Sequence, residues 1–156
     1  RYDIVEAGFK YPMNDVSAAI GLIQLGKLPA WQKRREHIAK HYREALQGIP
    51  GLRLPPEAAP GDVHGNHLFV VRIDPDIVGR DRLGVALRDA GIETSVHFVP
   101  LHLQPYFQKS WGCREGQFPV TERAFREILS LPMHAGMADY DALLVASEIR
   151  RVLAAG

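Results

Sequence analysis

Residues 96–107, VHFVPLHLQPYF, hold the side chains of this sequence best suited to polar recognition. His97 and His102 stand there among two prolines and several aromatic residues. An imidazole donates or accepts hydrogen bonds, and a phenol such as that of Tyr106 joins an apolar ring to a polar group. The stretch therefore has the composition of a binding-site rim, and equally that of satisfied histidines at the edge of a domain.

The histidine spacing gives little support for a metal site. The chain has seven histidines, of which His64 and His67 form one close pair and His97 and His102 another. A zinc site needs three or four ligands that converge. Because neither pair supplies the remaining ligands, we predict no metal site.

Other chemistry is limited by what the sequence lacks. Glycine-rich phosphate loops of the GxGxxG and GxxxxGK[ST] types are absent, and so is the GxSxG turn of serine hydrolases. The formal net charge is +1, which favours neither nucleic acid nor an anionic membrane as partner. The basic run KRREH fits a solvated helix face.

The compartment is predicted from cysteine and hydropathy patterns. Cys113 is the single cysteine, which excludes an intrachain disulfide and favours a reducing cytoplasm. No apolar run approaches the roughly 20 residues that span a bilayer. The chain begins without methionine and without a signal-peptide pattern, so we expect a piece of a longer protein.

Periodicity and breaker residues predict an α+β order of elements. Residues 1–14 read as loop, and Asn14 as the N-cap of an apolar helix that is buried on most sides as far as Leu25. Pro29 is expected to end that pattern and to begin a second helix. The further predictions are a surface connection at 50–66, strands at 67–74, 92–99 and 129–131, and helices at 80–91, 121–128 and 139–154, the last capped by Asp139.

Five segments in order carry a resemblance to a known family. They are GFKYPMNDVSAAIGLIQLGKL, HIAKHYREAL, NHLFVVRI, AGIETSVHFVPLHLQPYF and PVTERAFREILSLPMHAGM. Each is weak alone, but their succession across residues 8–137 resembles the C-terminal part of the PLP-dependent nucleotide-sugar aminotransferases of the DegT–DnrJ–StrS group.

The resemblance implies a type I aminotransferase fold. In that fold a large α/β domain holds the cofactor, a small C-terminal α+β domain covers it, and two subunits share each active site. Residues 1–14 then correspond to a loop from the missing large domain. Residues 15–156 correspond to the small domain, with a small antiparallel sheet, helices packed on one face and a long interdomain helical segment before it.

The implied activity belongs to the intact homodimer. It transfers an amino group, from glutamate, to a nucleotide-linked keto-sugar in polysaccharide biosynthesis. The Schiff-base lysine and the acid that pairs with the PLP ring nitrogen lie upstream in the family. The lysines of this chain stand in no such motif, so the chain alone is expected to be inactive, to hold no catalytic residue and to bind no pyridoxal 5'-phosphate. They are Lys10, Lys27, Lys33, Lys40 and Lys109.

The resemblance also implies binding residues. Lys10 matches a loop position that reaches the PLP phosphate of the neighbouring subunit, and Tyr11 would line the same edge. Pro12 stands where some members have arginine. His97 and His102 would face the nucleotide sugar, with Tyr106 as a wall of the substrate site.

Two other functions share these features. One is a binding or oligomerisation module without chemistry, and the other is a sensor-type family member that has lost catalysis. Because the expected catalytic lysine lies outside this sequence, residues 1–156 leave the three alternatives open.

Overall fold

The computed structural model of the chain describes residues 3 and 5–155. Residues 1, 2 and 4 of the predicted loop, and residue 156 at the end of the predicted small domain, lie outside the described residues. The described residues before Asp15 form neither helix nor strand, as Gly8 and Pro12 led us to expect.

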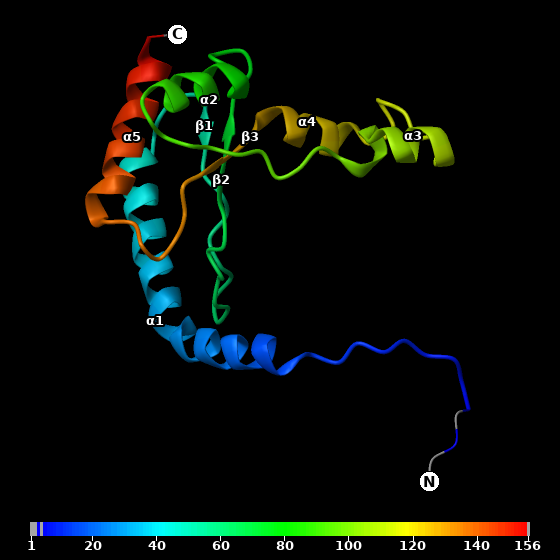
Figure 1. Cartoon of the computed structure of the whole chain (residues 1–156). Helices are drawn as coiled ribbons and strands as arrows, with labels where there is room; N and C mark the ends of the chain where they lie inside the picture. The colour runs from blue at the N-terminus through cyan, green and yellow to red at the C-terminus, as the bar shows by residue number, and fades with distance from the viewer. Residues whose placement is uncertain (1–2, 4, 156) are drawn as a thin grey trace.

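A single long helix, α1 (Asp15–Leu46), follows this segment. The predicted cap is confirmed, because Asn14 Oδ1 accepts a hydrogen bond of 2.8 Å from the Ser17 N–H. The predicted break at Pro29 is wrong, since Pro29 lies inside the helix. A proline within a helix removes one backbone hydrogen bond and kinks the axis. The ribbon of α1 accordingly changes direction between its dark blue and light blue parts (Figure 1).

A small antiparallel sheet forms the centre of the fold. Its order is β1 (Leu52–Arg53), β2 (Phe69–Ile73) and β3 (Ile128–Leu131). β2 pairs with β3 from Phe69 opposite Leu131 to Arg72 opposite Ile128. Alternate residues of β2 are buried and half-buried. One face of the sheet therefore meets the core more fully than the other.

The predicted strand at 92–99 is wrong. Only Ser95 pairs with β3, through hydrogen bonds of 2.8 and 3.2 Å to the backbone of Ser130. Two residues before Ser95, Glu93 would have to pair with Pro132, which has no N–H to donate. Two residues after Ser95, His97 would pair with Ile128, where β3 begins, and the residue before Ile128 belongs to a helix. The alternating sequence therefore has no longer strand to pair with.

The remaining helices agree with the predictions in part. The last helix has the predicted bounds, although its N-cap is Ala138 and Asp139 is the first helical residue. The helix that begins at Pro105 was not predicted. Proline is common in the first turn of a helix, so Pro105 could have indicated its start. The elements are α2 (Arg80–Asp89), the 3-10 turn η1 (Leu101–Leu103), α3 (Pro105–Trp111), α4 (Pro119–Glu127) and α5 (Asp139–Ala154).

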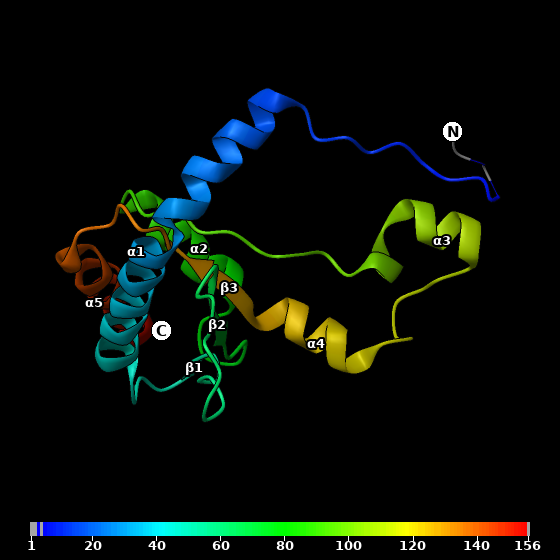
Figure 2. The same cartoon turned by 90° about the horizontal axis from the view of Figure 1, so that it is seen from below.

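The core lies between the sheet and three helices. α1, α2 and α5 cluster on one side of the sheet, whereas α4 and α3 extend away from it on the other (Figures 1 and 2). The second half of α1 runs beside α5, and buried side chains of both belong to the same hydrophobic core as those of β2. The largest fully buried residues include Tyr42, Leu46, Phe69, Val71, Leu87 and Ile149.

The first half of α1 is exposed, so the prediction that it is buried on most sides is wrong for this chain. Its buried residues begin only at Ile38. The exposed apolar side chains before that point include Val16, Ile20, Leu22, Ile23 and Leu25. None of the helices in the described part of the chain has the length and hydropathy to cross a membrane.

One partly buried hydrogen bond joins α1 to the segment after β3. Tyr42 Oη donates to the carbonyl of Pro132 at 2.9 Å, and its ring stacks on Phe69 with centroids 4.9 Å apart. Burial, with the nearby charge of Asp141, raises the pKa of Tyr42. The neutral phenol therefore persists as a donor to higher pH than an ordinary tyrosine would.

We predict that Tyr42→Phe lowers the free energy of unfolding by about 1 kcal/mol, because the half-buried Pro132 carbonyl then loses its donor. Urea-induced unfolding measures this change. Tyr140→Phe is the matched control, because Tyr140 is an exposed tyrosine of α5 and its substitution should change stability by less than about 0.5 kcal/mol. Equal effects of the two substitutions would contradict the assigned hydrogen bond.

Candidate functional site

His97 lies at the edge of the sheet, next to the Ser95–Ser130 bridge. Its Nδ1 atom is 2.9 Å from Ser130 Oγ, and its ring meets the Phe98 ring edge-on, with centroids 4.8 Å apart. Because Ser130 engages Nδ1, Nε2 remains for a ligand. A small cavity of about 130 Å³ adjoins the ring, and its lining includes Leu68, Thr94, Ser130 and Met133.

His102 is buried and turned toward α4. Its Nε2 atom is 2.8 Å from Glu122 Oε1, and both side chains are largely buried. Glu122 also accepts hydrogen bonds from the backbone N–H groups of Gly116, at 2.8 and 3.0 Å, and of Phe118, at 3.2 Å. This carboxylate therefore fastens η1, the loop before α4 and α4 itself to one another.

The charge of Glu122 is set by these contacts. Burial by itself raises the pKa of this carboxyl, but the hydrogen bonds from His102, Phe118 and Gly116 outweigh it. The pKa therefore lies below its ordinary value, and Glu122 is ionised near neutral pH. An acid in the first turn of a helix was visible in the sequence, but nothing there indicated His102 as its partner.

Two arginines of the sheet fix the direction of α4. Glu127, the last residue of α4, accepts hydrogen bonds from Arg53 at 3.0 Å and from Arg72 at 2.8 Å. Arg80 adds a hydrogen bond of 2.6 Å to the Phe125 carbonyl and lies over the Phe125 ring. These contacts anchor the C-terminal end of α4 to the sheet and to α2, and the contact of His102 with Glu122 joins η1 to the same helix.

We call η1, α3 and α4 the arm, residues 101–127. Tyr106 lies on it with 67% of its surface exposed, and its ring meets that of Phe107 edge-on. The arm and the residues before it expose several large apolar side chains, as contact sites commonly do. Its exposed members include Phe98, Leu101, Tyr106, Trp111, Phe118 and Val120.

Lys10 and Tyr11 lie in the extended segment before α1. Tyr11 is 85% exposed, and its ring is tilted against that of Phe9 at 5.7 Å. Lys10 is exposed as well. The N-terminal segment and the arm leave the core on the same side in both views (Figures 1 and 2). An exposed ammonium fits a phosphate group as a point charge, so Lys10 suits the predicted cofactor contact.

The structure thus separates the predicted site residues into three places. His97 belongs to the sheet edge, His102 and Tyr106 to the arm, and Lys10 and Tyr11 to the N-terminal segment. His97 and His102 do not share a face, because their rings bond to β3 and α4 respectively. The groups supply hydrogen-bond donors, a cation and aromatic walls, which can bind and orient a polar ligand.

Comparisons with known proteins identify almost the whole chain with one family. The sequence model of the DegT/DnrJ/EryC1/StrS aminotransferase family matches residues 1–150. The spore coat polysaccharide biosynthesis protein SpsC of Bacillus subtilis is 40% identical over 155 residues, which cover 97% of this chain and 40% of SpsC. The chain therefore spans about 40% of the length of the curated relatives it matches.

Solved structures agree with this result. The aminotransferase TlmJ of Streptoalloteichus hindustanus is 36% identical, with a TM-score of 0.83 over 99% of this chain and 40% of TlmJ. Spr1654 of Streptococcus pneumoniae, a candidate sugar aminotransferase in its PLP form, is 25% identical, with a TM-score of 0.87 over 99% of this chain and 39% of Spr1654. The predicted fold class, a small α+β domain of an aminotransferase, is confirmed.

The buried carboxylate generates a pH-dependent prediction. Because the folded-state pKa of Glu122 is lowered, its contribution to stability is present above the unfolded carboxyl pKa of about 4.3 and is lost as pH falls through the lower folded value. We expect the stability difference between the wild type and Glu122→Gln to shrink as pH falls below about 4.

Thermal unfolding at a series of pH values measures this difference. Glu115→Gln is the control, because Glu115 is exposed in the same loop and its substitution should give a small difference at every pH. If the wild type is more stable than Glu122→Gln by the same amount at every pH, the ionised carboxylate of Glu122 is not what joins η1 to α4.

Proposed function

The chain belongs to the DegT/DnrJ/EryC1/StrS aminotransferase family, and on that premise we propose that it is the C-terminal small domain of a PLP-dependent sugar aminotransferase. In the intact protein the reaction moves an amino group, from glutamate, to a nucleotide-linked keto-sugar. The observation that carries this proposal is the family match along almost the whole chain, over about 40% of the length of each relative. The name of SpsC supports a product used in polysaccharide biosynthesis.

We propose that the chain contributes contacts and leaves the covalent chemistry to the rest of the protein. When bound, PLP supplies the electron sink that amino-group transfer requires. Lys10 of one subunit holds the cofactor phosphate of the other, as a cation on an extended segment can do. Tyr11 lines the same edge. The lysine that binds PLP covalently belongs to the part of the protein that precedes this chain.

We assign the substrate side to the sheet edge and the arm. His97 Nε2 donates a hydrogen bond to a sugar hydroxyl or a diphosphate oxygen, while Ser130 holds the ring in place through Nδ1. Tyr106 forms a wall with its exposed ring. His102 acts through Glu122 as a positioning residue, since the pair fixes η1 directly before the helix that carries Tyr106.

The exposed apolar half of α1 fits the same proposal. A helix that shows Ile20, Leu22 and Ile23 to solvent in this chain is expected to be covered in a longer protein. We propose that the large domain and the second subunit of a homodimer cover it. The cytoplasm, which the single cysteine favours, is the compartment we propose for the enzyme.

Assay of the intact protein tests the function. With PLP, glutamate and a nucleotide-linked keto-sugar, it should release 2-oxoglutarate and form the amino sugar in equal amounts, and residues 1–156 alone should form neither. Mass spectrometry of the nucleotide sugar detects the product. An intact protein that binds no PLP and carries no lysine at the family position would instead favour the sensor or the binding module.

Substitution of Lys10 tests the cofactor contact. We expect Lys10→Ala to weaken PLP binding by the intact protein about 10–100-fold, because loss of a hydrogen bond to a charged group typically lowers affinity by that factor. Equilibrium dialysis of PLP measures the affinity. Lys40→Ala is the control, because Lys40 is exposed on the packed half of α1 and should leave PLP binding unchanged. Unchanged affinity in Lys10→Ala would reject the assigned role.

A further inference from the structure

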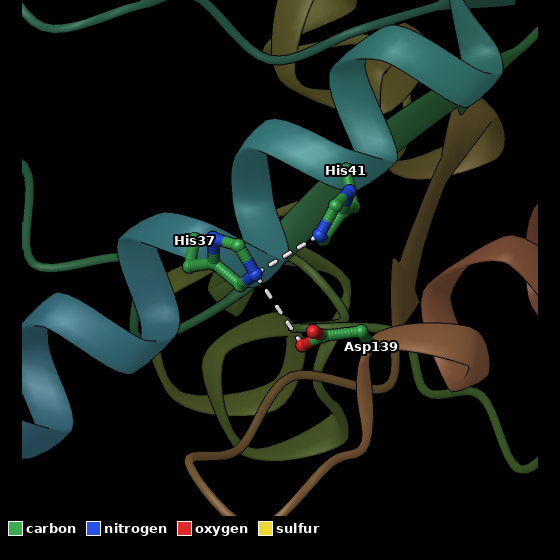
Figure 3. Close-up of side chains that lie close together, drawn as sticks. All are labelled: His37, His41 and Asp139. Carbon is green, nitrogen blue, oxygen red and sulfur yellow. Dashed lines mark hydrogen bonds and ion pairs between the residues drawn. The ribbon is translucent and has the colours of Figure 1, made fainter.

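A second polar cluster lies on the opposite part of the fold from the arm, where α1 meets the start of α5. His37 and His41 are four residues apart on α1, so their rings project from the same face of the helix. Asp139 begins α5 and points its carboxylate toward them (Figure 3). His37 and His41 form a further close pair of histidines in the sequence, besides His64 with His67 and His97 with His102. The third residue of the cluster, Asp139, lies almost a hundred residues further along the chain.

We propose that His37, His41 and Asp139 bind a divalent transition-metal ion of the Zn²⁺ type and that this ion links α1 to α5. The proposal is independent of the proposed aminotransferase activity. It revises the expectation from the sequence that the chain has no metal site.

Two of the three distances between the donor atoms match those that a metal ion imposes, and the third is bounded. Two ligand atoms each about 2.0–2.1 Å from Zn²⁺ lie about 2.9–3.4 Å apart when their bonds meet at about 90–110°. His41 Nε2 lies 3.0 Å from His37 Nε2, and Asp139 Oδ1 lies 3.4 Å from the same nitrogen. All three donor atoms lie within 4.8 Å of one another. Small changes of side-chain angle therefore bring all three around one ion.

The chemistry of the donors selects the class of ion. Two neutral imidazoles and a carboxylate suit Zn²⁺, Cu²⁺, Ni²⁺ and Fe²⁺, whereas Mg²⁺ and Ca²⁺ prefer sites made of oxygen atoms. Paired histidines at this spacing on a helix are a recognised zinc-ligand arrangement. The side chains of His37 and Asp139 are 48% and 60% exposed, so water molecules can complete the coordination.

Arg34 holds the carboxylate in position. Its guanidinium donates to Asp139 Oδ1 and to the carbonyl of Met137. An ionised carboxylate has about four lone-pair sites, so this contact leaves sites for a metal ion. Hydrogen bonds of this kind to a ligand carboxylate are typical of protein metal sites and set its orientation. Arg34 thereby presents Asp139 to the two histidines before any ion arrives.

Zinc titration of the intact protein tests the proposal. After removal of metals with a chelator, isothermal titration calorimetry with Zn²⁺ should show a binding event that His41→Gln and Asp139→Asn each weaken at least about tenfold, because even outer-shell changes cost that much. His67→Gln is the matched control, since His67 is an exposed histidine outside the cluster. Titration with Mg²⁺ should give no heat that depends on His41.

Thermal unfolding provides a second measurement. Excess Zn²⁺ should raise the melting temperature of the wild type and of His67→Gln, and this rise should be absent in His41→Gln. Circular dichroism of each variant without metal verifies that it is folded. Zinc affinity and a zinc-dependent melting shift that are the same in the wild type and His41→Gln would overturn the proposal, as would the absence of zinc binding by the wild type.

Discussion

The packing of the second half of α1 between α5 and the sheet is the constraint on which the rest of this structure depends. Tyr42 stacks on Phe69 of β2 and bonds to the Pro132 carbonyl, so one side chain connects the helix, the central strand and the segment that leads to α5. Ile149 of α5 is fully buried in the same core. The N-terminal segment, the first half of α1 and the arm extend from this core and expose their apolar side chains. Exposed apolar side chains of this kind are typical of surfaces that contact another domain or subunit.

Local signals made much of the fold predictable from the sequence. The Asn14 cap and the helix at residues 139–154 were predicted, because capping and periodicity act within a few residues. Pro29 was misread, because the sequence does not show whether a helix bends at a proline or ends there. The strand at 92–99 was wrong for a different reason. Alternation predicts an extended chain, but a strand also needs a partner, and β3 offers one only at Ser130.

The candidate site was predictable in part, because a resemblance locates residues but not the contacts between them. The pattern around His97 and His102 suggested two rings on one side of a cleft. In the structure His97 bonds to Ser130 and His102 to Glu122, and each of those partners lies at least 20 residues away in the chain. Such long-range pairs depend on the fold. For His102 the contact with Glu122 supports the positioning role that we propose.

The joint between α1 and α5 shows how the same reasoning reaches beyond the resemblance. Arg34 contacts the start of α5 at Asp139, and Arg150 donates to the carbonyl of Ala45, at 3.0 Å from Nε, so both contacts join residues 105 apart in the chain. The two helices therefore run side by side in the same direction, as Figure 1 shows for their cyan and red ribbons. The buried part of α1 begins next to His37, at Ile38. An ion held by His37, His41 and Asp139 would thus fasten α1 at the point where it leaves the core, and would fix the direction in which its exposed half projects.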